Sequence, residues 1–217
     1  MKKFLLLCLL FVSHAWAQIP APEVVLPELS ALEGAAFLEH HIKSSHTLLE
    51  EGSIAFVKDQ KSSAYPRGDF ALLWGLGSVE SDQQMTRNEY VIMWRIMNYL
   101  SDLGFRVVMN TKTLEKHVRE AVETEGVSVI LYSGHGNETG FYDFNKKRIS
   151  YEIFANKARS VYQFILAACY GTEARHLYNQ PSDLMLFTWS GLTNSTDLEH
   201  FIMGKWTGLE GRDLILR

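Results

Sequence analysis

Cysteine is scarce in this sequence. The 217 residues include 2 cysteines, Cys8 and Cys169, and Cys8 lies within an apolar run near the start of the chain. Two cysteines cannot form the several disulfides that hold small secreted domains together. A disulfide framework is therefore excluded. Cys169 is expected to be a free thiol, either a small buried hydrophobic side chain or a reactive group.

The sequence also has no excess of positive charge. Lysine and arginine number 21 against 25 acidic residues, which gives a formal net charge of −4 at pH 7. Nucleic-acid-binding domains usually have a strongly basic surface, so we predict no nucleic-acid partner. No second long apolar segment follows the first, so we also predict no membrane span. With 47% hydrophobic residues, the chain is expected to form one main globular domain.

Residues 1–17 have the order of residue types found in export signals. A basic start is followed by an apolar run over residues 4–12 and by the small-x-small sequence Ala15-Trp16-Ala17. This run is too short to cross a bilayer. The large Leu7 before Cys8 disfavours a lipoprotein signal. We predict a signal peptide that is cut near Ala17, with export of the remainder to the periplasm or out of the cell.

Short apolar runs alternate with helical patterns through the rest of the chain. The apolar runs predict strands over residues 70–77, 105–109, 127–132, 161–167 and 183–189. Apolar residues at helical spacing predict helices over residues 28–51, 88–103, 111–123 and 172–178, with Thr113 as a cap of the third. Such alternation indicates an α/β fold with a mainly parallel central sheet.

The first of these helices belongs to an N-terminal extension. We place the extension at residues 18–67 and the main domain at residues 68–217. An amphipathic helix in this position could be an inhibitory pro-segment, a docking element or an extra layer on the sheet. Nothing in its residues resembles a substrate, so we favour the extra layer.

Two of the predicted strands end in a chemically reactive side chain beside glycine. One ends in Ser133-Gly134-His135-Gly136, and the next ends in Ala167-Ala168-Cys169-Tyr170-Gly171. Sites in parallel sheets form beyond the carboxyl ends of the strands, so His135 and Cys169 are expected to meet there. An imidazole can take the thiol proton, and the amides of Gly136 and Cys169 can donate to a developing oxyanion.

These motifs resemble those of the caspase-like (clan CD) cysteine peptidases, which include caspases, metacaspases, legumains, gingipains and clostripain. In that family a hydrophobic strand ending in His-Gly precedes a second strand ending in Ala-Cys or Gly-Cys. The resemblance extends over about residues 68–197, and residues 140–144 are similar to the hairpin that often follows the His-Gly turn. It implies an α/β/α sandwich and a peptide or protein substrate. His135 would be the general base and acid, Cys169 the nucleophile, and Gly136 an oxyanion donor.

The same resemblance bears on specificity. Caspases commonly have glutamine two residues before the catalytic cysteine, where this chain has Ala167, so a preference for aspartate is not expected. Residues 190–197 are similar to a metacaspase segment in which an aspartate binds a basic P1 side chain. Asp197 would then favour arginine or lysine at P1. The alternative is that Asp197 caps a helix over residues 198–203.

Other features give weaker indications. His40, His41 and His46 suggest a metal site, but no two of them have i, i+4 spacing, so we predict a solvated helix and no metal. No cofactor is indicated, and calcium dependence and oligomeric state are left open. A catalytically silent caspase-like binding or assembly module is the main alternative to a peptidase. A redox-sensing thiol would explain Cys169 but not His135.

Overall fold

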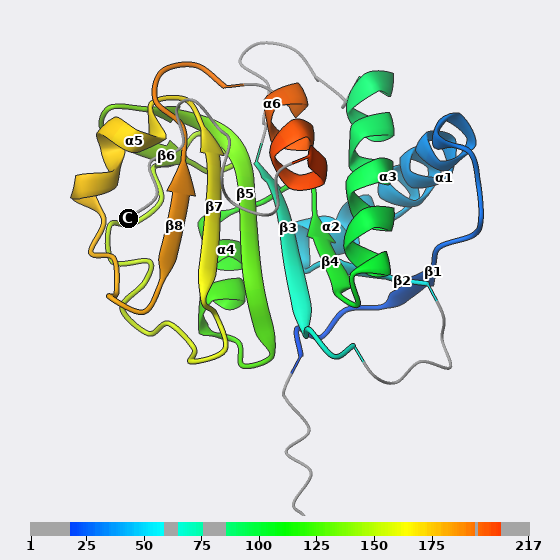
Figure 1. The fold of residues 1–217 in the computed structure, drawn as a ribbon, viewed down its shortest axis with the longest axis horizontal. Coiled ribbons are helices and arrows are strands. Elements are labelled where there is room, and N and C mark those ends of the chain that lie inside the picture. The colour runs from blue at the N-terminus through cyan, green and yellow to red at the C-terminus, as the bar shows by residue number, and fades with distance from the viewer. Residues whose placement is uncertain (1–17, 59–64, 76–85, 194, 205–217) are drawn as a thin grey trace, which may run out of the picture.

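The computed structural model describes residues 18–58, 65–75, 86–193 and 195–204. The predicted signal peptide and the last two residues of the strand predicted over residues 70–77 lie outside these ranges. The described part is an α/β fold built on one 8-stranded sheet (Figure 1), in which β6 pairs only with β5. The order of the other strands is β1-β2-β4-β3-β5-β7-β8.

Five parallel strands form the centre of this sheet, as the alternation of strands and helices predicted. They are β3 (Asp69–Gly75), β4 (Arg106–Asn110), β5 (Val127–Asn137), β7 (Gln163–Ala168) and β8 (Met185–Thr188). Helix α3 (Arg87–Asp102) connects β3 to β4, and α4 (Glu115–Glu123) connects β4 to β5. All residues of β3, β4 and β7 are buried, as expected for strands covered on both faces.

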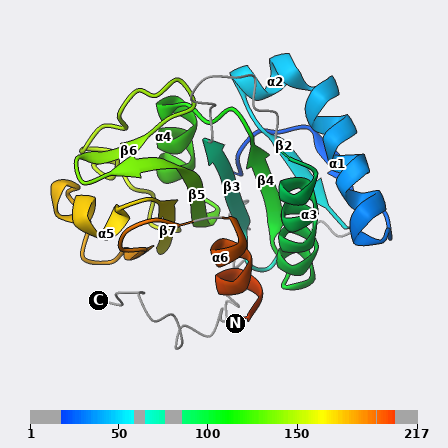
Figure 2. The ribbon, with the colours of Figure 1, turned by 90° about the horizontal axis from the view of Figure 1, so that it is seen from above.

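Helices cover both faces of the sheet, which gives three layers (Figures 1 and 2). One core includes side chains from α3 and α6 (Ser195–Glu199), for example Trp94 and Leu198, with Leu131 and Ala167 of the sheet. The opposite core includes Val118 of α4, Phe164 of the sheet and residues from the long connection between β6 and β7. This arrangement is compatible with an α/β/α sandwich.

The N-terminal extension both lengthens and covers the sheet. It contains β1 (Glu23–Val25), α1 (Ala31–Ser44), α2 (His46–Glu51) and β2 (Ile54–Val57). Strand β2 pairs antiparallel with β4, β1 pairs parallel with β2, and α1 packs against α3. The single helix predicted over residues 28–51 is wrong in its bounds, because Ser30 caps α1 and a new helix starts after Ser45.

The start of α4 also differs from the prediction. The helix begins at Glu115, and Thr113 does not cap it, because its hydroxyl donates to the Asn110 carbonyl oxygen at 3.0 Å. The ring of His117 takes the capping role instead, since its Nδ1 accepts from the Leu114 amide at 3.1 Å. His117 is only 2% exposed. Burial lowers the pKa of this imidazole to about 4 from an ordinary value of 6.5.

We therefore expect His117 to make the fold sensitive to acid. The folded state disfavours the protonated ring, so its contribution is complete above about pH 6.5 and is lost as the pH falls towards 4. The loss amounts to about 3 kcal/mol over that range. The free energy of unfolding, measured in urea as a function of pH, should fall more in the wild type than in His117→Gln, because glutamine keeps an acceptor but does not titrate in this range. An equal pH dependence of the unfolding free energy in the two proteins between pH 7 and 4 would contradict this assignment.

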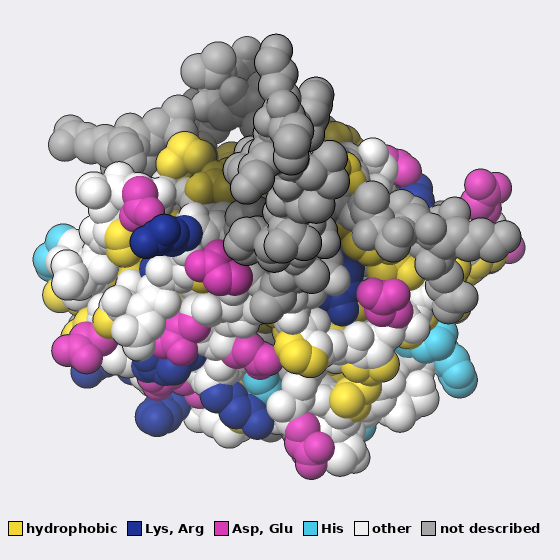
Figure 3. All heavy atoms as spheres, turned by 90° about the horizontal axis from the view of Figure 1, so that it is seen from below, with side chains coloured by type: hydrophobic (Ala, Val, Ile, Leu, Met, Phe, Trp, Pro, Cys, Tyr) yellow, Lys and Arg dark blue, Asp and Glu magenta, His cyan; other side chains and the backbone are white. Residues whose placement is uncertain are grey.

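The described surface has charges of both signs. On the face at the amino ends of the parallel strands, Lys and Arg side chains are interspersed with Asp and Glu (Figure 3). In the part of the chain that the structure describes, no helix is both long enough and apolar enough to cross a membrane.

Candidate functional site

His135 lies where β5 leaves the parallel sheet. The strand pairs with β3 and β7 up to Gly134, and from His135 onwards it pairs antiparallel with β6 (Gly140–Tyr142). The predicted hairpin over residues 140–144 thus corresponds to β6 and the turn after it. His135 is half-buried, so its imidazole lies at the boundary between the sheet and solvent.

Cys169 is the first residue after β7. Ala168, the last residue of that strand, is in register with Gly134, so Cys169 and His135 each follow one member of a registered pair. Adjacent strands in a sheet lie about 4.8 Å apart, so the two backbones are neighbours here. Tyr170 then adopts a left-handed conformation with φ of 57°, which turns the chain into α5 (Gly171–Ala174). Cys169 is half-buried, and its thiol is free.

We expect both residues to lie towards the same face of the sheet, because side chains alternate along the strands that lead to them. Leu131 of β5 and Ala167 of β7 belong to the core beneath α3 and α6, and His135 and Cys169 follow them at even spacing. An observed contact agrees with this face. The Cys169 Sγ lies 3.9 Å from the carbonyl oxygen of Thr193, in the connection between β8 and α6.

Gly136 fills the narrow gap beside the main chain of Cys169. A Cβ atom at position 136 would lie 2.6 Å from the Cys169 carbonyl oxygen and 2.9 Å from the Ala168 Cβ. Non-bonded contacts this short with backbone atoms are not tolerated, so glycine is required sterically. The same closeness brings the Gly136 main chain beside the thiol-bearing residue, where an oxyanion donor has to be.

We expect Gly136→Ala to force β5 and the Cys169 turn apart. Any hydrolytic activity of the site should fall by at least about 100-fold, because a displacement of about 1 Å at a reacting group has effects of that size. A matched control is Gly52→Ala, since the nearest atom to a Cβ there is the Leu48 carbonyl oxygen at 3.8 Å. Retention of full activity by Gly136→Ala would show that the junction is looser than the structure indicates.

A short segment after β8 is hydrogen-bonded to the turn that follows Cys169. The Tyr170 amide donates to the Gly191 carbonyl oxygen at 2.6 Å, and the Thr172 amide donates to that of Trp189 at 3.0 Å. In return, the Gly191 amide donates to Glu173 Oε1 at 3.3 Å. We call residues 189–193 the closing loop. Sequence reasoning missed its contact with Cys169 and the role of Glu173, because no local pattern indicates which loop covers a strand end.

Asp197 lies in the first turn of α6, near this loop. The helix begins at Ser195, so Asp197 is inside it and is not the residue that caps a helix over residues 198–203. Its side chain is half-buried. The structure thus places Asp197 four residues after Thr193, whose carbonyl oxygen contacts the Cys169 thiol.

The histidines of the N-terminal extension lie on α1 and at the start of α2. His40 and His41 lie on α1 with ring centroids 5.6 Å apart, and His46 contacts Lys112 and Glu50. No group of three or more histidine, cysteine or acidic residues that could hold a metal ion occurs within the described ranges.

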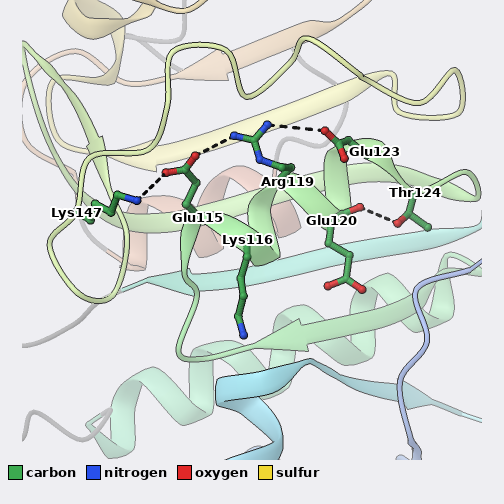
Figure 4. Close-up of a pocket in the computed structure, with 7 residues that line it drawn as sticks. All are labelled: Glu115, Lys116, Arg119, Glu120, Glu123, Thr124 and Lys147. Carbon is green, nitrogen blue, oxygen red and sulfur yellow. Dashed lines mark hydrogen bonds and ion pairs between the residues drawn. The ribbon is translucent and has the colours of Figure 1, made fainter.

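A surface hollow lies over α4, away from Cys169 (Figure 4). Four of its charged side chains form ion pairs, with Arg119 2.9 Å from Glu115 and 3.8 Å from Glu123, and Lys147 3.8 Å from Glu115. Its lining contains no cysteine or histidine. We therefore place the candidate site at the carboxyl ends of β5 and β7.

The chain matches no protein-family model, and no curated protein is significantly similar to it in sequence.

Proposed function

We propose that this chain is a cysteine endopeptidase with His135 and Cys169 as its catalytic pair. The main support is the register of Gly134 with Ala168. It puts His135 and Cys169 on neighbouring backbones at the carboxyl ends of two adjacent parallel strands. Both residues are half-buried, so they can meet a substrate without unfolding of the core. A purely structural thiol would need no histidine in this position.

In the proposed reaction, His135 takes the proton of the Cys169 thiol as the thiolate attacks the carbonyl carbon of a peptide bond. The carbonyl oxygen becomes an oxyanion, to which the amides of Gly136 and Cys169 donate. The C–N bond then breaks, and the leaving amine takes the proton from His135. Water hydrolyses the remaining thioester with His135 as base, which restores the thiol.

The sheet topology supports a caspase-like member of the cysteine peptidases. Counted along the chain, the five parallel strands lie in the order second, first, third, fourth, fifth. The histidine lies near the carboxyl end of the third of these, and the cysteine directly follows the fourth, in the chain order that the resemblance to the caspase-like family implies. We also propose that the protein is exported, because a secretory signal would precede the first described residue.

Cleavage of a fluorogenic peptide library that varies P1 tests this function. We expect turnover that is abolished by thiol alkylation and by Cys169→Ala. The contact between the Cys169 thiol and the Thr193 carbonyl oxygen favours a second candidate, a binding module, because it engages the thiol with a main-chain acceptor. Binding of peptides without cleavage, unchanged in His135→Ala, would favour that module.

A further inference from the structure

Buried polar atoms without partners occur in the segment after Cys169, at the end of β8 and in the closing loop. In the described part of the chain, they include Oε2 of Glu173 and the hydroxyls of Thr172, Thr188 and Thr193. These residues lie in the two segments that hold the Cys169 turn against the end of β8. Native proteins leave few buried polar atoms unpaired, since each costs about 1–3 kcal/mol. A cluster of them beside a nucleophile indicates that a ligand completes their hydrogen bonds.

The geometry fixes where these groups lie. Glu173 follows Cys169 by four residues on α5, and its Oε1 accepts from the Gly191 amide at 3.3 Å. The other oxygen, Oε2, has no access to solvent. Thr188 is 0% exposed, and its hydroxyl faces the start of α5, where it would lie 1.9 Å from a Cβ at Gly171. Thr193 belongs to the closing loop, and its carbonyl oxygen contacts the Cys169 Sγ.

The charge of this cluster selects the class of ligand. Glu173 is its acidic member, and none of the ion pairs among the described residues includes Glu173. A carboxylate oxygen needs a donor, and threonine hydroxyls accept as well as donate. A guanidinium or ammonium group supplies several donors and the opposite charge, and charged hydrogen bonds of this kind are stronger than neutral ones.

We propose that Glu173 and its threonine neighbours form the pocket for a basic P1 side chain, with Glu173 Oε2 as the partner of the arginine or lysine. This inference rests on the proposed peptidase function and names a specificity-determining residue within it. Substrate binding would shift the closing loop enough to admit the side chain, while the bond from Gly191 to Oε1 holds the carboxylate in place. The acidic partner of the P1 side chain would then be Glu173 in place of Asp197, which the family resemblance suggested.

The test compares Glu173→Gln with the wild type on substrates that differ only at P1. Glutamine keeps an acceptor for the Gly191 amide but removes the charge, so the loop stays in place. We expect kcat/KM for arginine and lysine at P1 to fall about 10- to 100-fold, with little change for leucine or glutamine at P1. Glu152→Gln, at an exposed acidic residue on the β6–β7 connection, is the matched control.

Two results would overturn the assignment. One is an equal fall for all P1 residues in Glu173→Gln. The other is loss of the preference for a basic P1 residue in Asp197→Asn while Glu173→Gln retains that preference.

A binding experiment separates this inference from the peptidase proposal. Calorimetry on Cys169→Ala would compare a peptide with arginine at P1 with its citrulline analogue. Arginine-selective binding that depends on Glu173, without cleavage by the wild type, supports the pocket and contradicts the peptidase. Absence of both selective binding and cleavage contradicts both.

Discussion

Cys169→Ala is expected to abolish peptide hydrolysis, with a loss of at least about 1,000-fold in kcat, because no other group in the site can form the thioester. His135→Ala should cause a loss of similar size, since the thiol then has no base and the leaving amine has no acid. Residues that act as a unit have non-additive effects. The double variant is therefore expected to be no less active than the worse of the two single variants. Initial rates with a fluorogenic peptide measure all three.

Controls separate chemistry from folding in this experiment. Cys169 and His135 are half-buried and lie outside the two cores, so the melting temperatures of both variants should stay close to that of the wild type. His176→Ala is a matched histidine control, because His176 is exposed on the turn after α5. Hydrolysis by Cys169→Ala at the wild-type rate would exclude the peptidase mechanism.

Arg106→Leu is expected to destabilise the fold by about 3–5 kcal/mol, the usual cost of leaving a buried charge without its partner. Arg106 is 4% exposed and Asp69 is 0% exposed, and they lie in register at the amino ends of β4 and β3 with Nη1 3.0 Å from Oδ2. Burial raises the pKa of Asp69, and the Arg106 guanidinium opposes this shift without cancelling it. Removal of the guanidinium would leave the hydrogen bond from the Ile19 amide to oppose the effect of burial.

The pair also fixes the first described residues to the sheet. Arg106 donates to the Ile19 carbonyl oxygen at 3.1 Å and to Glu23 at 2.9 Å, while the Ile19 amide donates to Asp69 Oδ2 at 3.0 Å. Equilibrium unfolding in urea measures the loss. The double variant Asp69→Leu/Arg106→Leu should be more stable than Arg106→Leu alone, because apolar pairs of similar volume replace buried ion pairs at little cost. A double variant that is less stable than Arg106→Leu would contradict this account.

The parallel centre of the fold could be predicted from the sequence because burial on both faces leaves continuous apolar runs. The strand predicted over residues 161–167 is β7 (Gln163–Ala168), which ends one residue later than predicted, directly before Cys169. Strand β2 was not predicted. It has 4 residues, and its place beside β4 depends on antiparallel pairing with a strand some fifty residues away.

That the backbones at His135 and Cys169 are neighbours could be predicted in part. The prediction needed only that two adjacent parallel strands have their carboxyl ends side by side, and the register of Gly134 with Ala168 meets this condition. The closing loop was not predictable, because its bonds join residues about twenty positions apart through main-chain atoms that any sequence possesses. Glu173 was missed for the same reason, since its importance depends on the Gly191 amide and on an oxygen that burial leaves unpaired.

Covalent trapping tests the central claim most directly. A peptidyl acyloxymethyl ketone reacts with a thiolate only where a base activates it and donors hold the carbonyl oxygen. Mass spectrometry of the intact protein and of its tryptic peptides would locate the adduct and follow its rate. We expect one adduct per chain, on Cys169, formed at least about 100-fold faster in the wild type than in His135→Ala. Equal labelling rates in these two proteins would contradict a catalytic pair formed by His135 and Cys169.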